Sequence, residues 1–383
     1  MLNVNVNSYY IQVTRYKACS NGHLKIIPAT GPSGVVNKGI INIRLSGNIA
    51  GKNYMSVSDT VSSKLNEITG IDYTSKIMIL PNEVDFRGGA AWAALNGNTI
   101  WVHDQFAKFP MVQIHEYGHL LGMHHSGKGD KTYADNTGYM GNQLPWNEDG
   151  AITCFNPAKT WYLGWYSWRH ITVNPTQSAF NDNLVSLDDV VNSNAGVVKM
   201  IVRVIGDQNE FFIMFNRAKG VNEGAVGYRD QVVITQQNSE SSVSYVMAGL
   251  GDGQYWTYDN FGGTNKRLVI KNCYTSSESR DTAKVLIYIQ GQNDQSCSEQ
   301  VITTAESGWN EDNNVSESDN VDSCQSFDWW FDSDGPKYNC LWYAEIPTRC
   351  PWYGHKFEKF DMVANEACCE CGGGMVVNNE SKR

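Results

Sequence analysis

The sequence of 383 residues predicts an α/β (α+β) domain with a mixed sheet, followed by a β-sandwich-like domain and a small disulfide-rich module. Helix-like and strand-like apolar segments alternate up to about residue 166, whereas short strand-like runs separated by Gly, Asn, Asp and Ser turns continue to residue 290. Six of the ten cysteines then lie in the last 60 residues. The predicted domains are 1–166 for the α/β domain, 167–290 for the β-sandwich-like domain, 291–323 for an acidic flexible linker, 324–374 for the cysteine-rich module and 375–383 for a tail.

The first part of the α/β domain is predicted to combine strands with one helix. Strands are expected in residues 8–46, because SYYIQVTRY, HLKIIP and GIINIRL are rich in β-branched and aromatic residues or alternate. Residues 56–65 favour an amphipathic helix, since apolar residues recur at every fourth position and Gly70 closes the segment. The run KIMILP, residues 76–81, is typical of a short buried strand.

A hairpin and a second helix are expected next. Asn96-Gly97 lies between the apolar runs GGAAWAAL and TIWVHD. An Asn-Gly pair between two apolar runs predicts a β-hairpin of two strands joined at this turn. Pro110 is favoured at a first helical position, so the helix is expected to start near it. The predicted core face of this helix comprises Met111, Ile114, Gly118 and Leu121.

The segment HEYGHLLGMHHS carries the chemistry of this domain. Its HExxH pattern places His115 and His119 one turn apart on one helix face. Gly122 can adopt a conformation that ends the helix and turns His125 toward the same point. Three neutral imidazoles that converge in this way suit one catalytic zinc ion with an open fourth position. Glu116 lies where a general base for a zinc-bound water is needed.

The alternative reading of this segment is a core helix with hydrogen-bonded histidines. It is disfavoured because four of the chain's eight histidines lie in residues 115–125. The adjacent His124 is expected to point elsewhere. An aperiodic loop rich in Gly, Asp and Asn follows and contains Met140, and residues 154–164 then predict a short helix with Pro157 near its start.

Cysteine usage predicts disulfides and hence an oxidising compartment. Cys273 and Cys297 flank the last strand of the second domain and are candidates to pair. Cys19 and Cys154 would then be left to form a disulfide in the first domain. A structural zinc knot in the tail is the alternative, but its CCxC pattern fits zinc spacing poorly. The disulfide candidates are Cys19, Cys154, Cys273, Cys297, Cys324, Cys340, Cys350, Cys368, Cys369 and Cys371.

The formal net charge of −10 belongs to one part of the chain. Residues 285–336 contain eleven acidic and no basic side chains, so the remainder, with 29 acidic and 30 basic residues, is nearly neutral. This distribution argues against a nucleic-acid partner. No apolar run approaches the ~20 residues that span a bilayer, and the amino end lacks the pattern of a signal peptide.

Several of these segments resemble one protein family. HEYGHLLGMHHS, YADNTGYMG and CFNPAKTWYLGWY, together with ACSNGHLKIIP near Cys19, resemble the gametolysin-type metalloproteases of the metzincin clan. The tail, from WFDSDGPKYNCLWYA to ANEACCECGGG, is similar to a cysteine-rich module of algal secreted proteins. The resemblance covers residues 15–166 most closely.

The resemblance implies a metzincin-like catalytic domain in a secreted zinc endopeptidase that cleaves cell-wall or extracellular-matrix proteins or glycoproteins. It makes His115, His119 and His125 the ligands of one Zn2+, Glu116 the base and Met140 the turn methionine beneath the metal. Some metzincins carry a switchable tyrosine ligand two residues after this methionine, where this chain has Asn142. The residues that the family pattern would place against substrate are Gly89, Ala90, Ala91 and Trp92 on a sheet edge, with Tyr139 and Gly141 beside the metal.

Two other functions remain possible on the sequence alone. A catalytically inactive metzincin-like protein could bind matrix through the C-terminal module, although such homologues usually lose the glutamate or a ligand. An intracellular protease would require the tail cysteines to be reduced. The sequence indicates no calcium site and does not specify the oligomeric state.

Overall fold

A computed structural model describes residues 6–141, 153–190, 199–238, 242–276, 281–297, 323–325, 332–334, 338, 340–345, 349–358, 362–373 and 375–377. Contacts divide the chain into two compact units, Met1–Cys297 and Ser298–Arg383. Asn142, most of the predicted linker 291–323 and the tail beyond residue 377 lie outside the described residues. The predicted boundary between residues 166 and 167 falls inside the first unit and stays a prediction.

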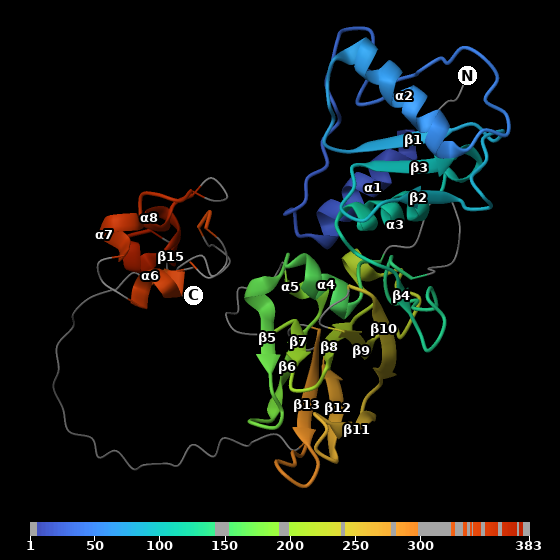
Figure 1. Cartoon of the computed structure of the whole chain (residues 1–383). Coiled ribbons are helices and arrows are strands. Elements are labelled where there is room, and N and C mark those ends of the chain that lie inside the picture. Colours follow the sequence, from blue (N-terminus) through green and yellow to red (C-terminus); the bar gives the residue numbers. More distant parts are fainter. Residues whose placement is uncertain are drawn as a thin grey trace, which may run out of the picture. The chain divides into compact units, whose positions relative to one another are not determined.

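A three-stranded mixed sheet forms the amino-terminal part of the first unit (Figure 1). Its strands are β1 (Lys76–Leu80), β2 (Ala91–Ala93) and β3 (Thr99–His103), in the order β1-β3-β2. β1 runs parallel to β3 and β2 antiparallel to it, so the predicted hairpin is confirmed and β2 lies at the edge.

One helix covers each face of this sheet. Helix α2 (Tyr54–Thr69) packs Tyr54 and Val57 against one face, and helix α3 (Pro110–Leu120) packs Val112 against the other. Both helices confirm the predictions from periodicity, and α2 ends at Gly70, whose left-handed φ of 64° few other residues adopt at low cost.

The prediction of strands in residues 8–46 is wrong. Residues Val6–Cys19 form helix α1, and the segment that follows contains only an isolated bridge between Asn37 and Ile40. Tyr16 and Cys19 lie one helical turn apart and are buried, so packing against the core outweighs the strand propensity of the tyrosines and β-branched residues.

Two further sheets follow in the same unit. One has six strands in the order β4-β10-β9-β8-β7-β5, and the other has four in the order β11-β12-β13-β6. The strands are β4 (Ser126–Gly127), β5 (His170–Val173), β6 (Phe180–Val185), β7 (Ile201–Val204), β8 (Asn209–Asn216), β9 (Gln231–Asn238), β10 (Ser244–Leu250), β11 (Tyr255–Phe261), β12 (Lys266–Ser276) and β13 (Thr282–Ile289).

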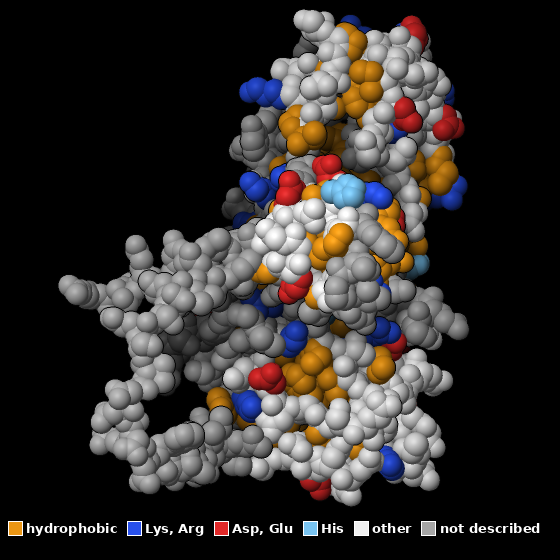
Figure 2. All heavy atoms as spheres, turned by 90° about the vertical axis from the view of Figure 1, so that its left-hand side faces the viewer, with side chains coloured by type: hydrophobic (Ala, Val, Ile, Leu, Met, Phe, Trp, Pro, Cys, Tyr) orange, Lys and Arg blue, Asp and Glu red, His pale blue; other side chains and the backbone are white. Residues whose placement is uncertain are grey.

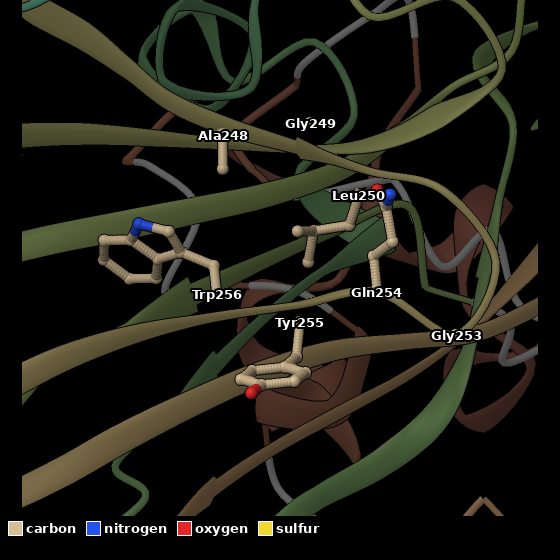
Figure 3. Close-up of a pocket in the computed structure, with 7 residues that line it drawn as sticks. All are labelled: Ala248, Gly249, Leu250, Gly253, Gln254, Tyr255 and Trp256. Carbon is tan, nitrogen blue, oxygen red and sulfur yellow. The ribbon is translucent and has the colours of Figure 1, made fainter.

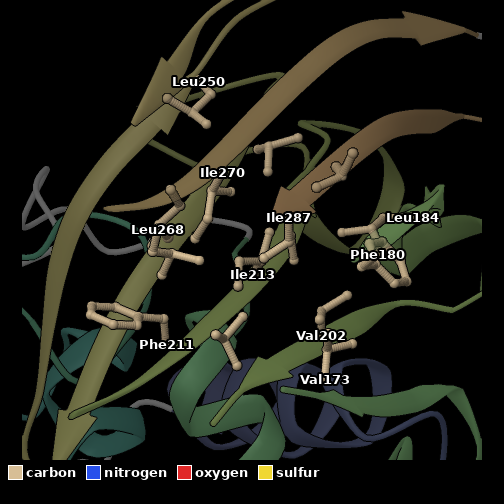
Figure 4. Packing of buried hydrophobic residues seen from close by; sticks show 14 of the residues in the cluster. Val173, Phe180, Leu184, Val202, Phe211, Ile213, Leu250, Leu268, Ile270 and Ile287 are labelled. Carbon is tan, nitrogen blue, oxygen red and sulfur yellow. The ribbon is translucent and has the colours of Figure 1, made fainter. Parts of the chain in front are cut away.

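The largest hydrophobic cluster draws its side chains from both sheets. Figure 4 shows Phe211 and Ile213 of the larger sheet close to Ile270 and Ile287 of the smaller one. Two sheets that share one core agree with a sandwich, and the assignment of a separate β-sandwich domain stays a prediction. The sequence indicated β7, β8, β9, β10 and β13. It missed β5, β6, β11 and β12, and it placed β4 in a loop.

Short helices complete the first unit. Helix α4 (Pro157–Leu163) begins after Asn156, whose side chain accepts a hydrogen bond from the Lys159 amide at 2.8 Å, and ends at Gly164, as predicted. Helix α5 (Leu187–Val190) is a single turn. The 3-10 helices of this unit are Asp104–Phe106, Ser167–Arg169 and Gly220–Asn222.

The second unit is small and is held by disulfides. It contains helices α6 (Cys340–Glu345), α7 (Arg349–Tyr353) and α8 (Ala364–Ala367), the 3-10 helix Cys369–Cys371, and the antiparallel pair β14 (Ser323–Gln325) and β15 (Met375–Val377). The Arg349 guanidinium lies 3.8 Å from the centre of the half-buried Trp342 ring.

Four disulfides join described cysteines: Cys19–Cys154, Cys273–Cys297, Cys340–Cys368 and Cys350–Cys371. The first two are the pairings considered from the sequence, and Cys369 is also disulfide-bonded. The side chain of Cys324 lies outside the described part. Because these tail cysteines are oxidised, they cannot act as thiolate ligands of a zinc knot. Within the described ranges, no helix is long and apolar enough to cross a membrane.

Candidate active site

Three histidine side chains converge at the carboxyl end of α3. The ligand atoms of His115, His119 and His125 all lie within 4.8 Å of one another, and the Nε2 atoms of His119 and His125 are 3.1 Å apart. His115 and His119 project from one helix face because they are four residues apart. His124 does not belong to this cluster. The structure therefore brings together the three residues that the motif predicted.

Backbone carbonyls orient two of the rings. His115 Nδ1 donates to the Tyr139 carbonyl at 2.8 Å, and His119 Nδ1 donates to the Met123 carbonyl at 2.7 Å. A carbonyl oxygen only accepts, so the ring proton is on Nδ1 in both residues and Nε2 has its lone pair available. Histidines that bind a metal through Nε2 usually donate their other ring N–H to a carbonyl or carboxylate oxygen in this way.

Burial keeps these imidazoles neutral. Burial, and secondarily the neighbouring histidines, lowers the pKa of His115 to about 3 and that of His125 to about 4. Burial likewise lowers the pKa of His119. Neutral imidazoles near pH 7 need not lose a proton before they bind a cation, so the cluster is chemically suited to a metal ion.

Glu116 adjoins the cluster in a position of low exposure. Its side chain lies on the same helix as two of the histidines and is 9% exposed. Burial raises its pKa to about 8 in the metal-free protein, and a dication nearby would oppose that shift. A carboxyl group with these properties can exchange a proton near neutral pH.

Met140 lies directly beneath α3. The side chain is 1% exposed, and a methyl group added at Gly118 would lie 2.3 Å from its sulfur atom. Only glycine at position 118 allows this approach. The Met140 carbonyl accepts the Ser126 amide at 2.7 Å, which ties the methionine turn to the segment after His125.

The two residues that flank Met140 are buried as well. The Tyr139 side chain is 1% exposed, so this residue offers the site its carbonyl, and burial raises the pKa of its phenol to about 12. Gly141 is buried where a side chain would collide with the Asp135 carbonyl. Their predicted contact with substrate stays a prediction.

The predicted substrate edge lies next to the metal helix. Ala91 and Ala93 face α3, whereas Trp92 is 43% exposed and lies toward Tyr54 on the opposite face. The Asn96 amide donates to the His119 carbonyl at 3.0 Å, so the turn of the hairpin is joined to the end of the helix. Gly89 and Ala90 lead into this strand, and Ala90 accepts a hydrogen bond from the His103 amide.

Sequence reasoning missed two residues near the cluster. The half-exposed Tyr133 ring lies 4.2 Å from the His125 ring, centre to centre. Lys159 is buried on α4, where burial lowers its pKa to about 7, and its ammonium group donates to the Ser242 carbonyl. Aromatic residues in loops and lysines in short helices are usually solvent-exposed, so no local pattern identifies these contacts.

A pocket away from the histidine cluster lies between β10 and β11 (Figure 3). Its lining includes Gln254, Tyr255 and Trp256 but no member of the histidine cluster. The phenol of Tyr255 is the only titratable group among the lining residues, so the pocket offers no acid–base pair.

Among the described residues, the surface shows no separation of charge on the face in Figure 2. Basic and acidic side chains are interspersed there.

A glutamate beside two histidines of a three-histidine cluster is the arrangement found in metallopeptidases. Residues 14–202 match the family model described as Gametolysin peptidase M11, and this region of the chain belongs to the gametolysin-type metallopeptidases. The match spans the mixed sheet, the cluster and Met140, and it ends within β7. No curated protein and no solved structure matches the chain, so the metzincin-like fold stays a prediction.

Proposed function

We propose that the protein is a zinc-dependent endopeptidase in which His115, His119 and His125 hold the ion and Glu116 is the general base. The observation that carries this proposal is the cluster itself, with two Nδ1 atoms bound to carbonyls and Nε2 available on both rings. Three imidazole ligands and an open fourth position are typical of catalytic zinc. When bound, the ion would acidify a water molecule and polarise the carbonyl of the scissile peptide bond.

Glu116 would move the proton in this reaction. Its carboxylate accepts a proton from the attacking water and then passes it to the amine of the leaving product. The low exposure of Glu116 limits competing hydrogen bonds from bulk water. The helix fixes the carboxyl group relative to His115, so the base and the cluster act on the same substrate carbonyl.

Strand β2 would position the substrate. It is the edge of the mixed sheet and pairs only with β3 among the described strands, so its other side can accept an extended peptide by strand addition. Ala91 and Ala93 pack on the face toward α3, so the backbone of β2 lies next to the helix that carries His115 and His119. The exposed Trp92 would meet substrate side chains on the other face.

The substrate class follows from the family rather than from the site. We infer that cell-wall or extracellular-matrix proteins or glycoproteins are cleaved outside the cell. The disulfides in both units are consistent with an oxidising compartment. The alternative of an inactive matrix-binding protein is disfavoured by the presence of Glu116 and all three histidines.

The substitution Glu116→Gln tests the mechanism. It should retain zinc and lower kcat for an unfolded protein substrate by about 10²–10⁴-fold, which is the usual contribution of a general base. Glu67→Gln on the exposed face of α2 is the control and should behave as the wild type. Full activity in Glu116→Gln would refute the assigned role, and a wild type that binds zinc but cleaves nothing would favour the matrix-binding alternative.

A further inference from the structure

The turn that follows α3 supplies two groups on which the candidate metal site depends. Its Met123 carbonyl accepts the hydrogen bond from His119 Nδ1, and its last residue is His125. Gly122, at φ +83°, starts the turn. The positions of two proposed ligands therefore depend on how the backbone of residues 122–125 is held.

Ser242 holds this turn on both sides of Met123. Its hydroxyl donates to the Gly122 carbonyl at 3.1 Å and accepts from the His124 amide at 3.1 Å. These backbone groups lie just beyond the end of the helix, where intrahelical partners are lacking. Because Met123 lies between the two anchored residues, the direction of its carbonyl is set by the same serine.

Ser242 is itself fixed by the β-rich part of the unit. The buried Lys159 ammonium donates to its carbonyl, and two residues later β10 begins beside β4 (Figure 1). The Ser244 amide donates to the His125 carbonyl at 3.4 Å, and the Ser244 and Ser126 hydroxyls are 2.7 Å apart. The turn is thus hydrogen-bonded to the start of β10, which is distant from it in the sequence.

Ser242 and Ser244 lie beyond the region that matches the peptidase family, which ends at residue 202. We propose that Ser242 is a positioning residue of the metal site, which holds residues 122–125 so that the Met123 carbonyl orients His119 and His125 reaches the cluster. This inference rests on the proposed function. It implies that the metal centre is completed by the segment that leads into β10.

A purely structural role for Ser242 predicts a different result from a positioning role. If the serine only stabilises the fold, Ser242→Ala lowers the thermal stability of the metal-free and zinc-bound proteins equally. If it positions the ligands, zinc binding weakens and the stabilisation that zinc provides becomes smaller. The difference between the two Tm values therefore separates the two roles even where the variant is less stable overall.

The experiment compares Ser242→Ala, Ser242→Thr and the exposed control Ser62→Ala in the full chain. For each variant, the zinc Kd is measured by competition with a chelator, Tm is measured with and without zinc, and the visible spectrum is recorded with Co2+ in place of zinc. Ser242→Ala should raise the zinc Kd by about tenfold, as loss of a residue that orients a metal ligand does, and should change the Co2+ spectrum. Ser242→Thr keeps the hydroxyl, so its zinc Kd and its Co2+ spectrum should be close to those of the wild type.

Two results would overturn the inference. An unchanged zinc Kd and an unchanged Co2+ spectrum in Ser242→Ala would show that the turn holds its position without the hydroxyl, while the proposed peptidase function could still stand. Failure of the wild type to bind zinc would overturn the inference and the metal site together. A zinc-bound wild type that cleaves nothing would refute only the proposed activity, because zinc affinity is measured independently of cleavage.

Discussion

Gly118 allows a direct test of the contact between α3 and Met140. The substitution Gly118→Ala adds one methyl group on the helix turn that carries the proposed ligands. That methyl group would lie 2.3 Å from Met140 Sδ and 3.2 Å from the terminal methyl groups of Met123 and Met140. Because contacting atoms normally stay about 3.5–4.0 Å apart, the sulfur atom must move by more than about 1 Å.

Two opposing effects determine the stability of this variant. Overpacking of a buried contact costs about 1–3 kcal/mol, whereas alanine in place of glycine within a helix contributes about 1 kcal/mol of stability. We therefore expect a net loss of about 1 kcal/mol, which lowers Tm by about 2 °C in a unit of this size. A displaced Met140 also shifts the neighbouring Tyr139 carbonyl that orients His115, so the zinc Kd should rise about tenfold.

Calorimetry and zinc titration check both effects. Gly251→Ala is the control, because its added methyl group would meet only the Gln254 side chain, at 3.4 Å. An increase in Tm with unchanged zinc affinity, as helix propensity alone would give, would contradict the packing of Met140 beneath the helix.

Two further predictions concern the histidines. His125→Ala should weaken zinc binding by at least about 100-fold, whereas His124→Ala should stay within a few-fold of the wild type; comparable losses in both would contradict the choice of ligand. The metal-free protein should lose stability as the pH falls from about 6.5 towards 3, because burial holds the pKa of His115 and His170 near 3 in the folded protein while the unfolded chain binds these protons near pH 6.5. A Tm of the metal-free protein that is constant between pH 7 and 4 would contradict that linkage.

Local sequence patterns predicted the elements whose geometry is set within a few residues. The HExxH spacing, Pro110 and Gly122 correctly indicated a helix with two histidines on one face and a turn that brings in a third. Asn96-Gly97 likewise indicated the β2–β3 hairpin. In these segments the local preference and the tertiary structure agree, which is why short-range reasoning sufficed.

Features that depend on distant contacts were not predictable in this way. Residues 8–16 (SYYIQVTRY) favoured a strand by composition. Burial of Tyr16, whose hydroxyl donates to the Ile114 carbonyl at 2.7 Å, instead stabilises this segment as a helix against α3. Ser242 lies about 120 residues from the turn that it holds. No spacing rule connects residues so far apart, so only the fold shows that the β-rich region supports the candidate site.

The most direct test of the central claim is a zinc titration of the metal-free protein with peptide cleavage as the readout. The account predicts that cleavage is absent without metal, rises in proportion to added zinc and reaches its plateau at one ion per chain, since one histidine cluster holds one ion. Cleavage by the zinc-free protein, or the absence of any cleavage after one equivalent of zinc has bound, would contradict the claim that this cluster is the catalytic centre of a zinc peptidase.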